Sequence, residues 1–223
     1  MRSSIEALKE AGIEFVVFLS SEGIQSDVKN VAASDFISYA HAQVEINLSE
    51  VFGEKGYVAV RPAWFASNSV QWNPMFRGGE VKVLHPEAKW DWISPADIGR
   101  VCGTIAAGVL QATGGKNVVH LNGPQLLSQR DAVAVIARAL GKEVKVLEID
   151  EVAYVEQMTN GSGLPEPVAK HLAKVLSNRG AGTDGMYVGQ VYEEAVNNIS
   201  KYGGRKAETF EEWVAENKQD FEV

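Results

Sequence analysis

Two serines, a tyrosine and a histidine are spaced as a proton-transfer site would require. Ser20 and Ser21 follow a strongly apolar run, and Tyr39 and His41 stand early in the next helical pattern. A tyrosine hydroxyl gives up its proton more readily when a lysine four residues later lowers its pKa. That position holds Gln43, so such a pair cannot form at this spacing. Tyr39 and His41 are candidate catalytic residues, although a packing or surface role is favoured for Tyr39 and a solvated helix position for His41.

A second candidate site is the segment at 61–68, RPAWFASN. It begins at the end of an apolar run that predicts a buried strand, and Pro62 is expected to end that strand. Parallel sheets bind ligands beyond the carboxyl ends of their strands, and Asn68 can both donate and accept hydrogen bonds. The segment therefore predicts a binding site. The alternative is that its aromatic side chains only cover the end of the sheet.

A glycine-rich phosphate loop is matched at one place, residues 180–185 (GAGTDG). Such a loop must follow a strand and open a helix, because the backbone N–H groups at the helix N-terminus hold the pyrophosphate. Here the preceding segment has a helical pattern, and no acidic residue that could bind a ribose ends a second strand further on. We favour the interpretation that Gly180 ends a helix after Asn178 and Arg179.

Other chemistry is not supported by residue spacing. The four histidines are dispersed without the spacing of metal ligands, so no metal is predicted; they stand at positions 41, 85, 120 and 171. No G-x-S-x-G nucleophile motif occurs. Cys102, the single cysteine, lies beside Val101 in a helical pattern and is expected to be a core thiol.

Composition indicates an ordinary globular protein. The chain has 223 residues with 21 basic and 29 acidic side chains, a net charge of -8. An acidic chain without a Lys/Arg cluster argues against nucleic-acid partners and against an anionic membrane surface. The N-terminus lacks a secretory pattern, and its strongest apolar run, Phe15–Leu19, is far below the roughly 20 residues that span a bilayer. We expect a cytoplasmic protein without membrane contact.

The elements that must position these residues follow an α/β pattern. Apolar runs at 13–19 and 57–61 are typical of parallel strands buried on both faces, and a long helix at 35–52 separates them. A helix is also expected at 5–11. Further strands are expected at 81–84, 117–121 and 142–149, and further helices at 95–113, 128–141, 151–158, 165–176, 193–201 and 209–221.

The predicted fold is a partial, Rossmann-like, doubly wound parallel sheet with a smaller, mostly helical α+β lobe. A doubly wound sheet normally has five or more strands, and this chain supplies fewer and opens within a helix. The sheet domain is expected at 1–65 and 92–121, and the lobe at 66–91 and 122–223.

Six segments, in this order and spacing, give the chain a family resemblance. They are FVVFLSSEG (15–23), HAQVEINL (41–48), VRPAWFASN (60–68), WISPADIGRV (92–101), VVHLNGPQLLSQRDAVAVIARALGKEV (118–144) and TFEEWVAENKQDF (209–221). Together they cover most of the chain. The sequence resembles the NmrA-like family of atypical short-chain dehydrogenases.

The resemblance implies NAD or NADP as cofactor and a small-molecule substrate. The family includes reductases of quinones, aldehydes or phenolic compounds, and also non-catalytic members that sense the dinucleotide. Residue by residue, it implies cofactor contacts from Ser20, Ser21, His41, Pro62, Ala63, Phe65 and Asn68. The aromatic-rich stretch suggests substrate-pocket walls at Trp64, Trp72, Met75, Phe76 and Trp92, with a protein-binding patch or a core as alternatives.

Two departures from the family pattern shape the functional prediction. His41 stands where many members carry a lysine that contacts the ribose. The family's glycine-rich N-terminal unit has no counterpart in this chain. The missing part would be on the order of a hundred residues long, since each βαβ unit needs about 30. We therefore expect a truncated chain that binds NAD(P) weakly or not at all. An oxidoreductase of small carbonyl, quinone or phenolic compounds is predicted; the alternatives are a dinucleotide-sensing regulator with a protein partner, and an inactive remnant.

Overall fold

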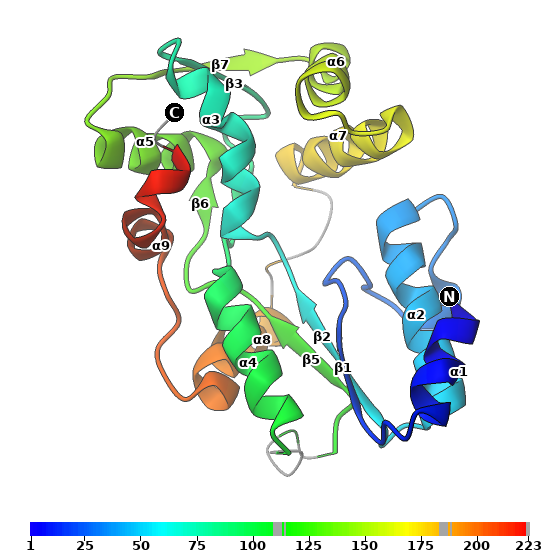
Figure 1. Cartoon of the computed structure of the whole chain (residues 1–223). Coiled ribbons are helices and arrows are strands. Elements are labelled where there is room, and N and C mark those ends of the chain that lie inside the picture. The colour runs from blue at the N-terminus through cyan, green and yellow to red at the C-terminus, as the bar shows by residue number, and fades with distance from the viewer. Residues whose placement is uncertain (109–112, 114, 183–186, 188, 222–223) are drawn as a thin grey trace. The chain divides into compact units, whose positions relative to one another are not determined.

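A computed structural model describes residues 1–108, 113, 115–182, 187 and 189–221 (Figure 1). The chain divides into two compact units. Unit 1 comprises Met1–Ala63, Pro95–Asn122 and Gly189–Ala207, and unit 2 comprises Trp64–Ser94, Gly123–Val188 and Glu208–Val223.

Unit 1 is built around a three-stranded parallel sheet in the order β1-β2-β5. The strands are β1 (Val16–Leu19), β2 (Tyr57–Pro62) and β5 (Val118–Leu121). Every residue of the central strand β2 is buried, which explains the apolar run Tyr57–Val60 that precedes Arg61. The predicted parallel α/β architecture is confirmed, although the first strand begins at Val16 and not at Ile13.

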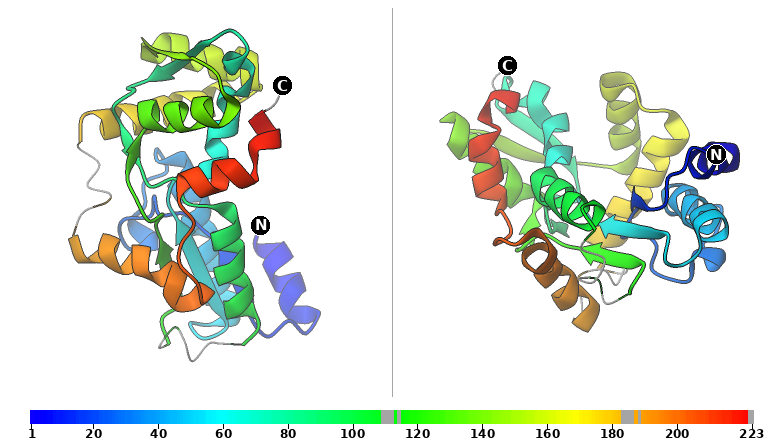
Figure 2. Two further views of the ribbon diagram at one scale, coloured as in Figure 1. Left: turned by 90° about the vertical axis from the view of Figure 1, so that its left-hand side faces the viewer. Right: turned by 60° about the horizontal axis from the view of Figure 1, so that its bottom comes forward.

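Helices cover both faces of this sheet (Figures 1 and 2). They are α1 (Arg2–Glu10), α2 (Phe36–Phe52), α4 (Pro95–Ala106) and α8 (Gly189–Gly203), with a short 3-10 helix at Val28–Asn30. Ile5 of α1 and Leu48 of α2 pack with Tyr57 and Ala59 of β2 on one face. Side chains alternate along a strand, so Val58 and Val60 point to the other face, where α4 contacts β2.

Local signals set the bounds of these helices. Asp35 and Gly53 flank α2, as predicted, and Gly53 has a positive φ of 72° that suits glycine. The helix opened by Pro95 ends at Ala106, earlier than expected; residues 109–112 and 114 lie outside the described part of the chain. Cys102 in this helix is half-buried and not part of the core that was expected, and partial burial raises the pKa of its thiol.

Unit 2 combines two small sheets with helices. Strand β3 (Glu80–Leu84) pairs parallel with β7 (Lys145–Ile149), and β4 (Lys89–Trp90) pairs antiparallel with β6 (Leu127–Ser128). The helices are α3 (Asn73–Phe76), α5 (Gln129–Leu140), α6 (Glu151–Ser162), α7 (Glu166–Gly180) and α9 (Phe210–Glu216), with 3-10 helices at Ala66–Trp72 and Lys218–Phe221.

Two differences from the predicted organisation have clear physical reasons. The lobe was expected to take all of 122–223, but α8 belongs to unit 1 because it packs against α4 and β5. The two-residue strands β4 and β6 were not predicted, since they are too short to show a periodic pattern. No helix in the described ranges is long and apolar enough to cross a membrane.

Capping boxes fix two helix starts that the sequence predicted. The Ser128 hydroxyl accepts a hydrogen bond from the Asp131 N–H, and the Asp131 carboxylate accepts from the Ser128 N–H. Thr209 and Glu212 make the same reciprocal pair at α9. Each box satisfies backbone N–H groups that have no partner within the helix.

Replacing Ser128 with Ala is expected to lower the free energy of unfolding by about 1 kcal/mol, because the α5 N-terminus loses its cap. Urea denaturation followed by circular dichroism measures this loss. Ser26→Ala, at an exposed loop position, is the control and should change stability little; equal losses in both variants would contradict the capping role.

Candidate functional site

The carboxyl ends of β1, β2 and β5 bring together polar side chains on the face that α2 covers. Ser20 and Glu22 follow β1, Arg61 lies near the end of β2, and His120 lies in β5. Arg61 and His120 are partners in the parallel register, so their side chains leave the sheet on the same side. This is the edge at which α/β sheets bind ligands.

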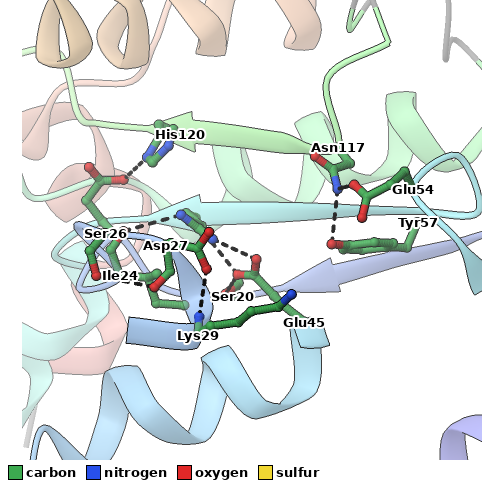
Figure 3. A network of polar contacts seen from close by, with 12 residues as sticks. Ser20, Ile24, Ser26, Asp27, Lys29, Glu45, Glu54, Tyr57, Asn117 and His120 are labelled. Atoms are coloured by element: carbon green, nitrogen blue, oxygen red, sulfur yellow. Dashed lines mark hydrogen bonds and ion pairs between the residues drawn. The ribbon is translucent and has the colours of Figure 1, made fainter. Parts of the chain in front are cut away.

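Arg61 and Glu45 form a buried ion pair, and Figure 3 shows Glu45 close to Ser20. Arg61 Nε and Nη2 donate to Glu45 Oε1 and Oε2 at 3.0 and 2.7 Å, and Arg61 Nη1 donates to the Ile24 carbonyl oxygen at 3.3 Å. Glu45 is 1% exposed and Arg61 is 7% exposed. Two fully desolvated charges persist only when their hydrogen bonds are satisfied, and this bidentate geometry meets that condition.

Ser20 is held by the same carboxylate. Its hydroxyl donates to Glu45 Oε1 at 2.5 Å, and its backbone N–H donates to the Val60 carbonyl oxygen at 2.7 Å. Ser21 Oγ accepts from the N–H of Gly23, where a Cβ would lie 2.6 Å from Ser38 Oγ. Gly23 therefore allows the loop after β1 to close against the start of α2. The predicted cofactor contacts of Ser20 and Ser21 stay predictions.

Glu22 and His120 form a second pair that the sequence did not reveal. Glu22 Oε2 lies 2.5 Å from His120 Nδ1, and the side chains are 9% and 28% exposed. Asn198 of α8 donates to the His120 carbonyl oxygen at 3.0 Å. The histidines were judged dispersed because no motif links residues 22 and 120. Their alignment at one sheet edge is a property of the parallel topology.

His41 stands one helical turn before Glu45 in α2. Partial burial lowers the pKa of its imidazole, although the nearby Glu45 acts in the opposite sense. Its ring lies 5.8 Å from that of Phe18. A neutral imidazole can form hydrogen bonds but does not supply the fixed cation of a lysine. Tyr39 is half-buried in the same helix.

The other residues with predicted cofactor contacts are divided between the units. Pro62 ends β2, and the Ala63 N–H donates to the Leu121 carbonyl oxygen at 3.1 Å, both within unit 1. Phe65 and Asn68 belong to unit 2, where Phe65 precedes a 3-10 helix and the Asn68 carbonyl oxygen accepts from Gln71. Their role at a nicotinamide ring stays a prediction.

Three of the predicted pocket walls belong to the hydrophobic core of unit 2. Trp72, Phe76 and Trp92 are 1–3% exposed, and Trp72 and Trp92 meet edge to face at 5.6 Å. Met75 is partly buried against this core, and Trp64 stacks on Trp90 at 4.1 Å. Contact with a substrate stays a prediction for all five.

Asp91 is a buried carboxylate in unit 2 that the sequence did not single out. Oδ1 accepts from the Trp64 N–H at 2.9 Å and from the Tyr187 hydroxyl at 2.7 Å, and Oδ2 accepts from the Gly123 N–H at 2.8 Å. Burial raises the pKa of Asp91 despite these donors. A Cβ at Gly123 would lie 1.9 Å from the Asp91 carbonyl oxygen, so this approach requires glycine.

A phosphate cradle does not form in the part of the chain that the structure describes. Gly180 is the last residue of α7, and a Cβ there would lie 2.6 Å from the His85 ring, so packing accounts for this glycine. Residues 183–185 of the glycine motif lie outside the described residues. Within the described ranges no group of three or more His, Cys, Asp or Glu side chains could hold a metal ion.

Known proteins similar to this chain are named as reductases, dehydrogenases and a regulation-like protein. No protein-family profile matches it. The nitrogen metabolite regulation-like protein bik4 of Gibberella fujikuroi is 36% identical over 96% of this chain and 69% of its own length. The NAD(P)H azoreductase of Xenophilus azovorans is 27% identical over 94% of this chain and 67% of its own length.

Solved structures share the fold. An NADPH-dependent quinone oxidoreductase from Escherichia coli superposes with a TM-score of 0.70 at 20% identity, covering 97% of this chain and 72% of its own. A mutant NmrA superposes with a TM-score of 0.58 at 16% identity, covering 96% of this chain and 68% of its own.

Replacing Glu45 with Leu is expected to cost about 3–5 kcal/mol of unfolding free energy, because Arg61 keeps a buried charge without its partner. The double replacement Glu45→Leu with Arg61→Leu should cost much less, since no charge remains. Urea denaturation of both variants measures the difference. The exposed Arg2→Gln variant, which breaks a solvated pair with Glu6, should stay near wild type. A double variant as unstable as the single one would contradict this account.

Proposed function

The chain belongs to the NmrA-like family of atypical short-chain dehydrogenases, and on that premise we propose that it is an NAD(P)-dependent oxidoreductase-type protein. Its substrate class is a small carbonyl, quinone or phenolic compound. The observation that carries this proposal is the polar network at the carboxyl ends of β1, β2 and β5 in unit 1. The names of the azoreductase and quinone oxidoreductase relatives support it.

The cofactor contacts proposed for unit 1 belong to the nicotinamide end of a dinucleotide. The loop after β1, with Ser20 and Ser21, and the end of β2, with Pro62 and Ala63, flank the start of α2 that carries His41. When bound, the nicotinamide would supply a hydride. The chain's own residues would orient the ring and the substrate and handle the proton.

The described residues do not supply a comparable site for the pyrophosphate end of a dinucleotide. A dinucleotide site needs a strand, a glycine-rich turn and a helix N-terminus in succession. That succession does not occur among the elements of the described residues. We therefore expect this chain by itself to bind NAD(P) weakly or not at all.

A second candidate function is dinucleotide sensing without turnover, through a protein partner. Two observations favour it: His41 has a lowered pKa and so supplies no fixed cation, and Gln43 replaces the lysine of a Tyr-Lys pair. A relative at 36% identity is named as regulation-like. Reduction of a quinone by NADPH separates the two functions, because only an enzyme turns it over.

Thermal unfolding with about 5 mM NADPH or NADH tests the cofactor proposal. A dissociation constant near 1 mM would stabilise the native state by about 1 kcal/mol, since a ligand stabilises by RT ln(1 + [L]/Kd). A small, nucleotide-specific rise in Tm is the expected result. An affinity in the micromolar range would contradict weak binding, and no shift at any concentration would remove cofactor binding from this chain.

His41→Lys tests where the cofactor lies. If His41 occupies the ribose-contacting position, a lysine there should bring the dissociation constant for NADPH down several-fold, because it adds a charged hydrogen-bond donor. Calorimetric titration measures the change. His171→Lys, in α7 of unit 2, is the matched control. An equal gain from both variants would indicate only a nonspecific effect of charge.

A further inference from the structure

We propose that Glu22 and His120 form a carboxylate–imidazole dyad in which His120 is the catalytic acid of the reduction and Glu22 is its positioning residue. This inference rests on the proposed oxidoreductase function. Tyr39 and Gln43 do not form the Tyr-Lys pair that would transfer a proton. The dyad would take that role.

The backbone holds the dyad at the ligand-binding edge of the sheet. His120 is part of β5, and Glu22 lies three residues beyond the last residue of β1. The Glu22 N–H donates to the Pro62 carbonyl oxygen at 3.0 Å, so Glu22 is tied to the end of β2. The pair therefore joins the carboxyl ends of all three strands, and Figure 3 shows His120 in the same view of polar contacts as Ser20 and Glu45.

The contact leaves one ring nitrogen available for chemistry. Glu22 lies against Nδ1 of His120 at 2.5 Å. A carboxylate there keeps a proton on Nδ1 and directs Nε2 to act as acid or base. Among the residues that the structure describes, Nε2 has no hydrogen-bond partner. The His120 side chain is 28% exposed, whereas Glu22 is 9% exposed, so the ring can be reached while its carboxylate stays shielded.

Charged side chains of unit 1 surround His120. Glu22 faces it from the loop after β1. Glu194 of α8 interacts with it electrostatically and is itself paired with Lys116 at 2.9 Å. Arg61 is its neighbour in β2 but is neutralised by Glu45. Glu22 is the carboxylate in direct contact with the imidazole.

The proton step balances as follows. When bound, the reduced nicotinamide of the proposed function would supply a hydride, with both electrons, to the substrate. A substrate oxygen would then become negatively charged, as the alkoxide of a simple carbonyl compound or the hydroquinone monoanion of a quinone. The Nε2–H bond of the His120 imidazolium breaks and an O–H bond forms on that oxygen. The neutral imidazole then takes a proton from solvent. Glu22 keeps its charge throughout and stabilises the imidazolium before transfer.

Nuclear magnetic resonance titration of the histidine rings tests the dyad without turnover. Glu22→Gln should change the titration of the His120 ring, since the carboxylate in contact with Nδ1 is lost. His171, in unit 2, is the internal control and should titrate unchanged. A His120 titration that is the same in wild type and Glu22→Gln would overturn the dyad.

Kinetics with NADPH and 2-methyl-1,4-naphthoquinone distinguish catalysis from a structural tie. His120→Gln should lower kcat by about 100-fold or more with KM nearly unchanged. In Glu22→Gln, the pH–rate profile should move by the same increment as the resonance titration, and Glu22→Asp should recover part of the rate. His171→Gln is the control for basal activity.

The outcomes separate this inference from the proposed function. Wild-type turnover that His120→Gln retains would overturn the dyad and leave the oxidoreductase function standing. A wild type without any turnover would overturn both, even if the two side chains are coupled in the titration. Should His120→Gln fail to fold, as judged by circular dichroism, the matched pH shift in Glu22→Gln decides the question.

Discussion

The buried ion pair between Arg61 and Glu45 is the constraint on which the carboxyl end of the unit 1 sheet depends. Arg61 belongs to the central strand, and Glu45 belongs to the middle of α2. Because both charges are desolvated, any shift of the helix along the strand would leave one of them unpaired at a cost of several kcal/mol. The pair therefore fixes the helix register, and with it the position of His41 one turn earlier. The Ser20 hydroxyl uses the same carboxylate, so the loop after β1 is held as well.

Unit 2 also contains a buried carboxylate that joins separate segments of the chain. Asp91 receives hydrogen bonds from the backbone of Trp64 and Gly123, each the first residue of a segment of this unit, and from the Tyr187 hydroxyl. Burial disfavours the ionised form, and the donors favour it. The two units thus each depend on a polar group placed where an apolar core would otherwise be expected.

The chemistry proposed for this chain depends on a difference between the Arg61–Glu45 pair and the Glu22–His120 pair. Glu45 is fully committed to Arg61 and Ser20, so it is unsuited to proton transfer. Glu22 and His120 lie at the same edge but are less enclosed, and the imidazole keeps one nitrogen free of partners within the described residues. The rigid, desolvated Arg61–Glu45 pair would hold the elements that orient a bound ring, and the more accessible Glu22–His120 pair would transfer a proton.

The sequence by itself determined the elements and the family. Apolar runs predicted the parallel strands, Asp35 and Gly53 predicted the ends of α2, and Ser128 and Thr209 predicted helix starts, because periodicity and capping act over a few residues. The ordered motifs indicated the NmrA-like family. Only the tertiary structure joined Glu22 with His120, 98 residues apart, and placed α8 with unit 1. Such contacts depend on which strand ends become neighbours in a parallel sheet, and no local pattern records that arrangement.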